Sequence, residues 1–383
     1  MRHLSIDILR MCAIFLMVFI HFTENLSGYS AASWMPTGFA APIFTFLAGM
    51  SYKIWLNVQE SQGVSDVDIS KKTLRRSLFL FGLGFAFNIL VWLPEDTFNW
   101  DILTLIATAF FVLNFCRKVD PSLSIVVCLL VFAASPSFRV IADYPEFWTN
   151  GYFEGDTTLS EILLGFLVTG FFPLFPWILY PITGFLVASS VFPNAHSTNN
   201  KRKFPRATGL LGVAFLVLAG LVLFTRSQFP DLANNAVGNQ FLEGWTMFPP
   251  SMAYVLGTLG LTLFAFAQCH YWIDQNPRFA QKTTNGTTGT LSERGRPLGT
   301  IARTFSRHSL SIYLLHHVVH LWPLWIYGSI YGDDPTQFWQ NALPAYASIS
   351  LSVLFLILCY FLFRWMDRTG KSAAEGLMRW VCD

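Results

Sequence analysis

Residues 5–21, SIDILRMCAIFLMVFIH, form an apolar stretch that carries ionisable side chains at both ends. About 20 helical residues cross the roughly 30 Å of hydrocarbon in a bilayer, and the apolar run continues to Leu26. A secretory signal sequence has a shorter apolar core without an ionised pair, whereas Asp7 and Arg10 stand inside this run. The stretch therefore predicts a first membrane-spanning helix over residues 6–26.

The composition excludes an ordinary water-soluble globule. Of the 383 residues, 53% are hydrophobic, 16% are aromatic and only 13% are charged, against about 25% charged residues in a typical soluble domain. The formal net charge of +2 supplies no basic arm for nucleic acid, so no nucleic-acid partner is expected. We predict an all-α, polytopic integral membrane protein whose partner is the lipid bilayer.

About ten apolar stretches are long enough to be transmembrane helices, although the fourth and fifth are short. They are 6–26, 39–57, 77–93, 102–116, 123–134, 172–192, 208–224, 249–269, 309–330 and 343–363. With ten spans, all Lys and Arg residues except Arg139 and Arg226 fall on the side of the N-terminus. Because basic residues are concentrated in cytoplasmic loops, both termini are predicted to be cytoplasmic.

The expected organisation is one transmembrane acyltransferase-like domain over residues 1–383. It has an extracytoplasmic loop at 135–171, a cytoplasmic loop at 270–307 and a cytoplasmic tail at 364–383; the label acyltransferase-like is what the resemblance described below implies. The apolar stretch 159–170 reads as an interfacial or re-entrant helix, because prolines follow it and break the sixth span. Irregular backbone at membrane depth is tolerated where protein or water satisfies it, so Trp177 is predicted to line a pocket.

The first helix holds the strongest candidate site residues, Asp7, Arg10 and His21. Arg10 and His21 are eleven residues apart, which is about 16 Å of helix and close to three full turns, so they share a face. Asp7 and Arg10 can pair at i, i+3, either to hold the guanidinium near the cytoplasmic mouth of the helix or only to anchor the helix. The imidazole of His21 suits proton transfer at neutral pH, and the alternative is a histidine that caps a neighbouring helix.

The ninth span contains RHSLSIYLLHHVVH, residues 307–320. His316 and His320 share one helix face, His317 points about 100° away, and Tyr313 lies one turn below. Three interpretations stay open: a polar cavity wall, packing, or a metal or haem site. The HxxxH spacing is a weak metal signal without a third ligand, so no metal is expected. Pairing of these histidines with His21 is a hypothesis.

Five segments together resemble the heparan-alpha-glucosaminide N-acetyltransferase family of membrane acyltransferases. They are SIDILR with MVFIH, APIFTFLAG, FPLFPWILYPITG, FPPSMAYVLGTLG and SLSIYLLHH. The spacing from Arg10 to His21 is also similar to the R-x10-H motif of the related acyltransferase-3 families, in which both residues are implicated in acyl transfer.

The resemblance implies ten or eleven helices and transfer of an acyl group, typically acetyl from acetyl-coenzyme A in the cytoplasm, to a sugar or glycolipid outside. His21 would be a general base or a nucleophile, with Arg10 and Asp7 positioning the helix and the donor. The acyl-transfer cavity would include Tyr313, His316, His317, Trp177 and Ser251. The candidates for binding the donor's phosphates are Arg10, Arg75, Arg76, Arg303 and Arg307, whose alternative role is that of ordinary positive-inside charges.

Two positions depart from the family pattern. Met11 follows Arg10 where the family usually has Gly, and the segment AASW offers Ala32 where the lysosomal branch has a histidine. The resemblance then implies that the catalytic role has moved to His21. A homodimer is left open, as is the choice between a bacterial inner membrane and an organelle membrane.

Two rival functions belong to other classes. A secondary transporter or flippase for a small or lipid-linked sugar would use the broken sixth span as its binding site. The chain shows no internal repeat, which such transporters usually have. Electron transfer through the histidines of the ninth span would require haem or a metal.

Overall fold

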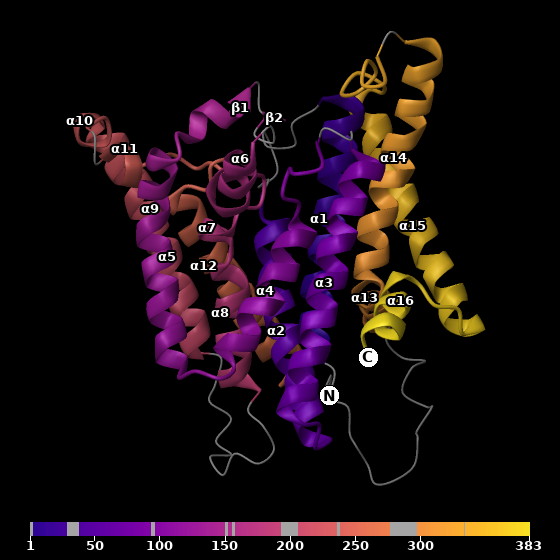
Figure 1. Ribbon diagram of the computed structural model, residues 1–383, viewed down its shortest axis with the longest axis horizontal. Helices are drawn as coiled ribbons and strands as arrows, with labels where there is room; N and C mark the ends of the chain where they lie inside the picture. The colour runs from indigo at the N-terminus through magenta and orange to yellow at the C-terminus, as the bar shows by residue number, and fades with distance from the viewer. Residues whose placement is uncertain are drawn as a thin grey trace. The chain divides into compact units, whose positions relative to one another are not determined.

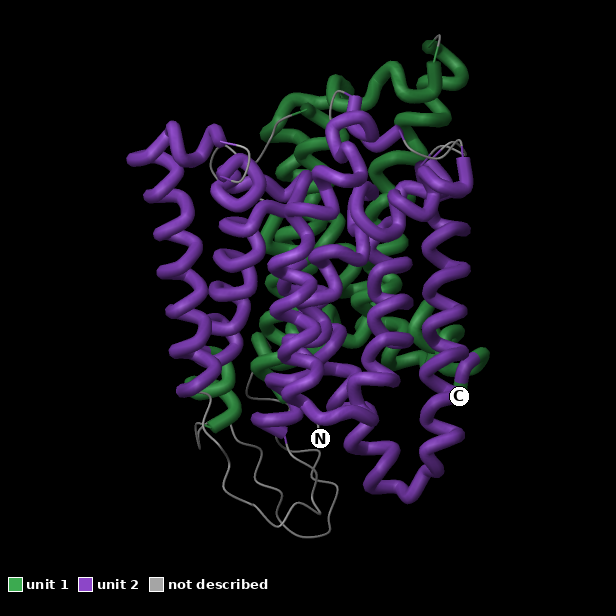
Figure 2. The backbone as a smooth tube through the Cα atoms, turned by 60° about the vertical axis from the view of Figure 1, so that its left-hand side comes forward, with its two compact units in different colours: residues 1–41, 269–381, 383 green, residues 42–268, 382 purple. Residues whose placement is uncertain are grey.

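The computed structural model describes residues 3–28, 38–92, 96–149, 152–154, 158–192, 206–235, 238–275, 297–332 and 334–383. These residues are almost entirely helical (Figure 1), apart from a hairpin of two-residue strands, β1 (Trp148–Thr149) and β2 (Tyr152–Phe153). The all-α prediction is confirmed. The chain divides into two compact units (Figure 2), one made of residues 1–41 and 269–381 and the other of residues 42–268.

Unit 1 joins the first helix to the last ones. Its elements are α1 (Leu4–Ser27), the π-helical turn η5 (His270–Asp274), α13 (Pro297–Arg307), α14 (Ser309–Tyr331), α15 (Ala345–Thr369) and α16 (Ala374–Cys382). Helix α1 packs against α13, α14 and α15. The first helix is therefore built into a unit whose other helices come from the end of the chain.

Unit 2 contains the intervening helices. They are α2 (Ala40–Ser61), α3 (Asp66–Val91), α4 (Ile102–Cys116), α5 (Pro121–Ile141), η3 (Tyr144–Phe147), α6 (Leu159–Leu164), the π-helical η4 (Gly165–Thr169), α7 (Leu174–Trp177), α8 (Leu179–Val191), α9 (Arg206–Gln228), α10 (Pro230–Ala233), α11 (Gly238–Phe241) and α12 (Met252–Cys269). Helix α3 packs along α4, and α8 contacts both α4 and α5.

Seven helical segments of the described part are long and apolar enough to cross a membrane. They are Leu4–Ser27, Asp66–Val91, Pro121–Ile141, Leu159–Val191, Arg206–Gln228, Met252–Asp274 and Ala345–Thr369. The other three predicted spans coincide with α2, α4 and α14. Helix α4 has only 15 residues, and three histidines lower the mean hydropathy of α14. Ten spans and two cytoplasmic termini stay predictions.

Several boundaries differ from those expected. Residues 135–141, expected in the loop 135–171, continue helix α5. Arg139 lies in this last part of α5 and is only 5% exposed. Its guanidinium donates to Glu243 Oε2 and to the Pro250 carbonyl, at 2.6 Å each, and this pairing allows a charged residue to be buried in the helix. Likewise, the expected loop 270–307 contains η5 and α13, and the expected tail 364–383 contains the end of α15 and all of α16.

The helical segment Leu159–Val191 is interrupted in its middle. The helix stops at Gly170, Pro173 precedes α7, and Phe175 has non-helical φ and ψ angles. The backbone N–H groups of Phe171 and Phe172 donate to the carbonyls of Asn99 and Trp100, at 3.1 and 3.0 Å. The prolines thus break the helix, and the chain itself satisfies these freed backbone groups, as irregular backbone in a membrane protein requires.

Two glycines let α2 and α8 approach until their backbones touch. A Cβ atom added to Gly49 would lie 1.9 Å from the Pro181 carbonyl oxygen, and one added to Gly184 would lie 2.0 Å from that of Phe46. Real Cβ atoms never approach oxygen so closely. Small residues at helix crossings give membrane proteins close van der Waals packing, so Gly49 and Gly184 fix the α2–α8 contact.

We expect Gly184→Ala to destabilise the protein by about 1–3 kcal/mol, because the new methyl group forces the two backbones apart. The measurement is thermal unfolding of the detergent-purified protein. Gly82→Ala is the matched control, since a Cβ at this position of α3 meets no atom within 4 Å. Equal melting temperatures for the two variants would contradict the role given to Gly184.

Candidate active site

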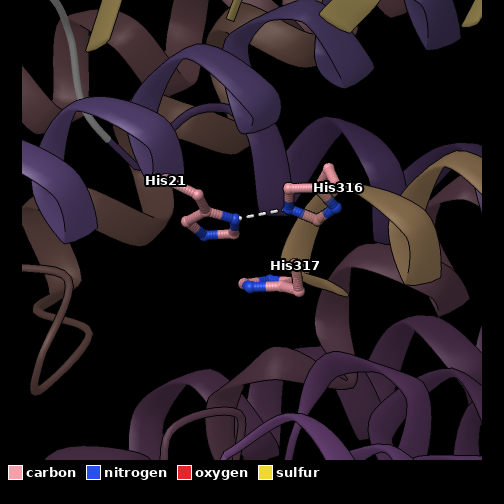
Figure 3. A group of neighbouring side chains, drawn as sticks. All are labelled: His21, His316 and His317. Carbon is pink, nitrogen blue, oxygen red and sulfur yellow. Dashed lines mark hydrogen bonds between the residues drawn. The ribbon is translucent and has the colours of Figure 1, made fainter. Parts of the chain in front are cut away.

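Three histidines of unit 1 meet between α1 and α14. His21 of α1 faces His316 and His317 of α14 (Figure 3), and the His21 Nδ1 atom lies 2.8 Å from His316 Nε2. The rings of His21 and His316 stack, with centroids 5.1 Å apart, and the His317 ring lies 4.6 Å from that of His21. His316 and His317 are buried, and His21 is partly buried.

The hydrogen bonds of His316 determine which nitrogen of His21 carries a proton. His316 Nδ1 lies 2.6 Å from the Tyr313 carbonyl oxygen. A carbonyl only accepts hydrogen bonds, so Nδ1 of His316 is protonated, and in the neutral ring its Nε2 is then an acceptor. His21 Nδ1 must then donate to His316 Nε2. In the neutral His21 ring this leaves Nε2 with the free lone pair, which is the atom that a base or nucleophile uses.

A second chain of hydrogen bonds holds the two helices together one turn further along. His320 Nδ1 donates to the His316 carbonyl at 2.6 Å, and His320 Nε2 accepts from the Asn25 side-chain amide at 2.8 Å. The Trp339 indole N–H donates to Asn25 Oδ1 at 3.2 Å. Sequence reasoning did not include Asn25 in the site. The available signal was an amide placed four residues after His21, on the same helix face.

Arg10 has a partner that sequence reasoning missed. Its guanidinium donates to the Ser306 hydroxyl at 2.9 Å and to the Ser306 carbonyl at 3.5 Å. Arg10 therefore connects α1 to α13. Asp7 is buried, with 3% of its surface exposed, and its pairing with Arg10 stays a prediction.

Asp274 and His270 were not predicted as site residues; Asp274 contacts the beginning of α1, and His270 contacts Asp274. Asp274 accepts hydrogen bonds from the backbone N–H of Ser5 at 3.1 Å and from the Ser5 hydroxyl at 2.5 Å. His270 Nδ1 lies 2.9 Å from the same carboxylate. Burial lowers the pKa of His3, which precedes the helix, and the nearby Asp274 carboxylate opposes that shift. These contacts satisfy the first turn of the helix that carries His21.

The other predicted cavity residues have different surroundings. Tyr313 is buried below the histidines, with its ring 5.7 Å from that of His316. Trp177 and Ser251 belong to unit 2. Trp177 is fully buried against Phe172 and Tyr180. The Ser251 hydroxyl accepts from the backbone N–H of Tyr254 at 3.1 Å, so it caps the start of α12.

Some of the basic residues predicted to bind the donor's phosphates belong to unit 1 and others belong to unit 2. Arg75 is exposed on α3, and Arg76 stacks on the Trp55 ring with its guanidinium carbon 4.4 Å from the ring centroid; these belong to unit 2. Arg303 and Arg307 lie on α13 of unit 1, and Arg307 pairs with Asp367 at 3.1 Å. Ala32, at the position of the family's histidine, lies outside the described residues.

Within the part of the chain that the structure describes, the three histidines form a group that could ligate a metal, since one nitrogen from each lies within 4.8 Å of the others. Two nitrogens bound to one tetrahedral zinc ion at about 2.0–2.1 Å lie roughly 3.3 Å apart. The 2.8 Å between His21 and His316 is instead a normal hydrogen-bond distance. The geometry favours a neutral hydrogen-bonded pair over a metal centre.

We expect the purified protein to contain no stoichiometric metal, because the two nitrogens share a proton. Mass-spectrometric elemental analysis of protein purified without chelators measures this directly, with the His316→Ala variant as its control. One equivalent of zinc, copper or iron in the wild type that disappears in the variant would overturn the expectation. An absorbance spectrum of the same sample tests for haem.

Comparison with protein families supplies independent information about the chain. A family model described as "Heparan-alpha-glucosaminide N-acetyltransferase, catalytic" matches residues 2–229. This match covers more than half of the chain and includes α1 with Arg10 and His21. A comparison with curated proteins finds no match.

Proposed function

The chain belongs to the heparan-alpha-glucosaminide N-acetyltransferase family and is a membrane acetyltransferase, and we propose that it takes its acetyl group from cytoplasmic acetyl-coenzyme A. The proposed acceptor is an amine or hydroxyl of a sugar or glycolipid on the opposite side of the membrane. The match does not favour the transporter alternative, and the interrupted segment Leu159–Val191 is compatible with both functions.

The charge distribution supports a cytoplasmic donor. With ten spans, the side that holds nearly all Lys and Arg residues is the cytoplasmic one, and coenzyme A carries several negative charges on its phosphates. Arg10, Arg75, Arg76, Arg303 and Arg307 are the proposed cations at that side. Arginine suits this role because its planar guanidinium can bind phosphate through two hydrogen bonds.

The single observation that supports the mechanism is a chain of two hydrogen bonds. It connects the Tyr313 carbonyl to His316 Nδ1, and His316 Nε2 to His21 Nδ1. It leaves the lone pair of His21 on Nε2. As a general base, Nε2 takes the proton of the acceptor N–H or O–H while the acceptor atom bonds to the thioester carbonyl carbon. The C–S bond then breaks, and the coenzyme A thiolate leaves and takes up that proton.

The same nitrogen serves the alternative route. Nε2 bonds to the thioester carbonyl carbon, the C–S bond breaks and the coenzyme A thiolate leaves. The acetylated ring is cationic, and its Nδ1 proton is already shared with His316 Nε2, which can accept it. The acceptor atom then bonds to the acetyl carbon, the bond from that carbon to Nε2 breaks, and the proton of the acceptor N–H or O–H passes to the thiolate. In both routes, the hydrogen bond to His316 keeps the proton of the neutral His21 ring on Nδ1. We propose that Tyr313 and His317 stabilise the negative charge that develops on the carbonyl oxygen.

We expect His21→Ala to reduce turnover by about 10²- to 10⁴-fold, which is the contribution that general acid–base catalysis typically makes. The assay follows coenzyme A release in the presence of a glucosamine-bearing acceptor, and thermal unfolding verifies the fold. Cys12→Ala is the matched control, because Cys12 lies on the same helix and is exposed. Retained turnover in a folded His21→Ala protein would remove His21 from the mechanism.

We expect His316→Ala to lower kcat roughly 10²-fold with little change in KM for the donor, because His21 loses the acceptor that orients its Nδ1 proton. His316→Gln supplies a side-chain oxygen that can accept the same hydrogen bond, so it should recover part of the rate. If the glutamine variant is as slow as the alanine variant while both remain folded, the tautomer-holding role is wrong.

A further inference from the structure

A polar pocket of about 280 Å³ lies in unit 1 where α14 begins. The end of α13, the end of α15 and the first two turns of α16 surround it. Its charged and titratable lining residues are Arg307, His308, Asp367, Lys371, Glu375 and Arg379. The positive-inside pattern assigns this end of the unit to the cytoplasm.

The side of the pocket formed by α16 is held in place by α14, because the two helices cap each other. The Glu375 carboxylate accepts from the Ser311 backbone N–H at 3.0 Å and from the Ser311 hydroxyl at 2.6 Å. The same hydroxyl accepts from the backbone N–H of Ala374 at 2.9 Å. Each helix thus satisfies an N–H group in the first turn of the other, so α16 is fixed beside the start of the helix that carries His316.

The charges of the pocket are unbalanced in favour of an anion. Asp367 is engaged by Arg307 at 3.1 Å and by His308 at 3.2 Å, and Glu375 is engaged by Ser311. Among the described residues, Lys371 and Arg379 form no ion pair with an acid. Lys371 instead rests over the Trp365 ring, with its Nζ atom 4.3 Å from the centroid.

A buried polar atom of the pocket points to a ligand independently of these cations. His308 is only 5% exposed, and its Nδ1 makes no hydrogen bond within the described part of the chain. The nearest carboxylate oxygen, Glu375 Oε2, lies 3.9 Å away, beyond hydrogen-bond distance. Buried side-chain nitrogens normally have a partner, so a ligand in this pocket is the partner that the structure leaves open to Nδ1.

We propose that this pocket binds the phosphates at the nucleotide end of the acyl-coenzyme A donor, through Lys371, Arg379 and His308. The proposal rests on the proposed function and locates the donor within it. Cations and first-turn helix N–H groups are the donors that phosphate groups accept from in proteins. Lys371, Arg379 and His308 were not among the residues that the sequence assigned to the donor.

The position of the pocket along α14 matches the length of the donor. His308 precedes α14, and eight residues later His316 contacts His21, a rise of about 12 Å. The pantetheine arm has twelve bonds between its phosphate oxygen and its sulfur, which is about four residues of extended chain or roughly 14 Å. Phosphates held beside His308 therefore leave the thioester within reach of His21.

An anionic lipid headgroup offers the same phosphate chemistry, so the test must separate the two sources. The proposed experiment titrates the detergent-purified full chain with coenzyme A, with pantetheine, which has no phosphate, and with phosphatidylglycerol, using calorimetry. It compares the wild type with the double variant Lys371→Gln/Arg379→Gln. The control is Arg368→Gln, which removes an exposed cation of α15 that does not line the pocket.

We expect the double variant to bind coenzyme A at least tenfold more weakly than the wild type, because two charge-assisted contacts are lost. Pantetheine binding should be unchanged in the double variant, and Arg368→Gln should bind coenzyme A like the wild type. Thermal unfolding verifies that the variants are folded. Because both replaced side chains are exposed, the fold should tolerate them, and Lys371→Gln alone serves as a second variant.

Three outcomes would overturn the inference, and they are distinguishable. If the wild type, the double variant and Lys371→Gln bind coenzyme A equally, the pocket is not the phosphate site, and the proposed function stands. Loss of phosphatidylglycerol binding alone in the double variant makes the pocket a lipid site. If the wild type binds no coenzyme A, coenzyme A is not the donor, and both the proposed donor and the proposed phosphate site are wrong.

Discussion

A polar group in an apolar helix must find its partner within the protein, and this constraint organises unit 1. In α1, Arg10 is paired with Ser306, His21 with His316, and Asn25 with His320. All three lie on the helix face that meets α13 and α14. The interactions that make the helix compatible with a membrane thus also assemble the candidate site. Unit 2 obeys the same constraint where the helix break between η4 and α7 is satisfied by carbonyls of the chain.

The sequence predicts the parts of this arrangement that depend on local periodicity. Helical spacing places Arg10 and His21 on one face, the prolines after residue 170 indicate an interrupted helix, and the histidines of SLSIYLLHH identify α14. Helical spacing also places Asn25 on the face of His21, but the pairing of Asn25 with His320 and of Arg10 with Ser306 could not be predicted in this way. These pairings depend on the register between helices separated by almost 300 residues, and neither Asn25 nor Ser306 is an unusual residue type where it stands. The tautomer of His21 depends on a backbone carbonyl, which carries no sequence signal.

The candidate site gives a physical reason for proposing His21 as the reacting residue. From the resemblance we expected a family histidine at the position of Ala32, and the proposal gives the reacting nitrogen to His21 instead. A lone imidazole on an apolar helix would not have a defined tautomer. Here His316 and the Tyr313 carbonyl define it, so a base on α1 requires α14. Met11 after Arg10 packs as a buried side chain in the same helix, and the structure assigns it no further role.

The division of unit 1 between the two ends of the chain affects how the protein is made. The partners named here for Arg10, His21 and Asn25 of α1 follow them by 295 residues or more, and the whole of unit 2 is synthesised between them. At about 5–20 residues per second, roughly 15 to 60 s pass before the ribosome reaches α14. During that time Arg10, His21 and Asn25 do not yet have their partners Ser306, His316 and His320. Biogenesis of this protein therefore requires the insertion machinery, water or other parts of the chain to shelter these three groups until α13 and α14 arrive.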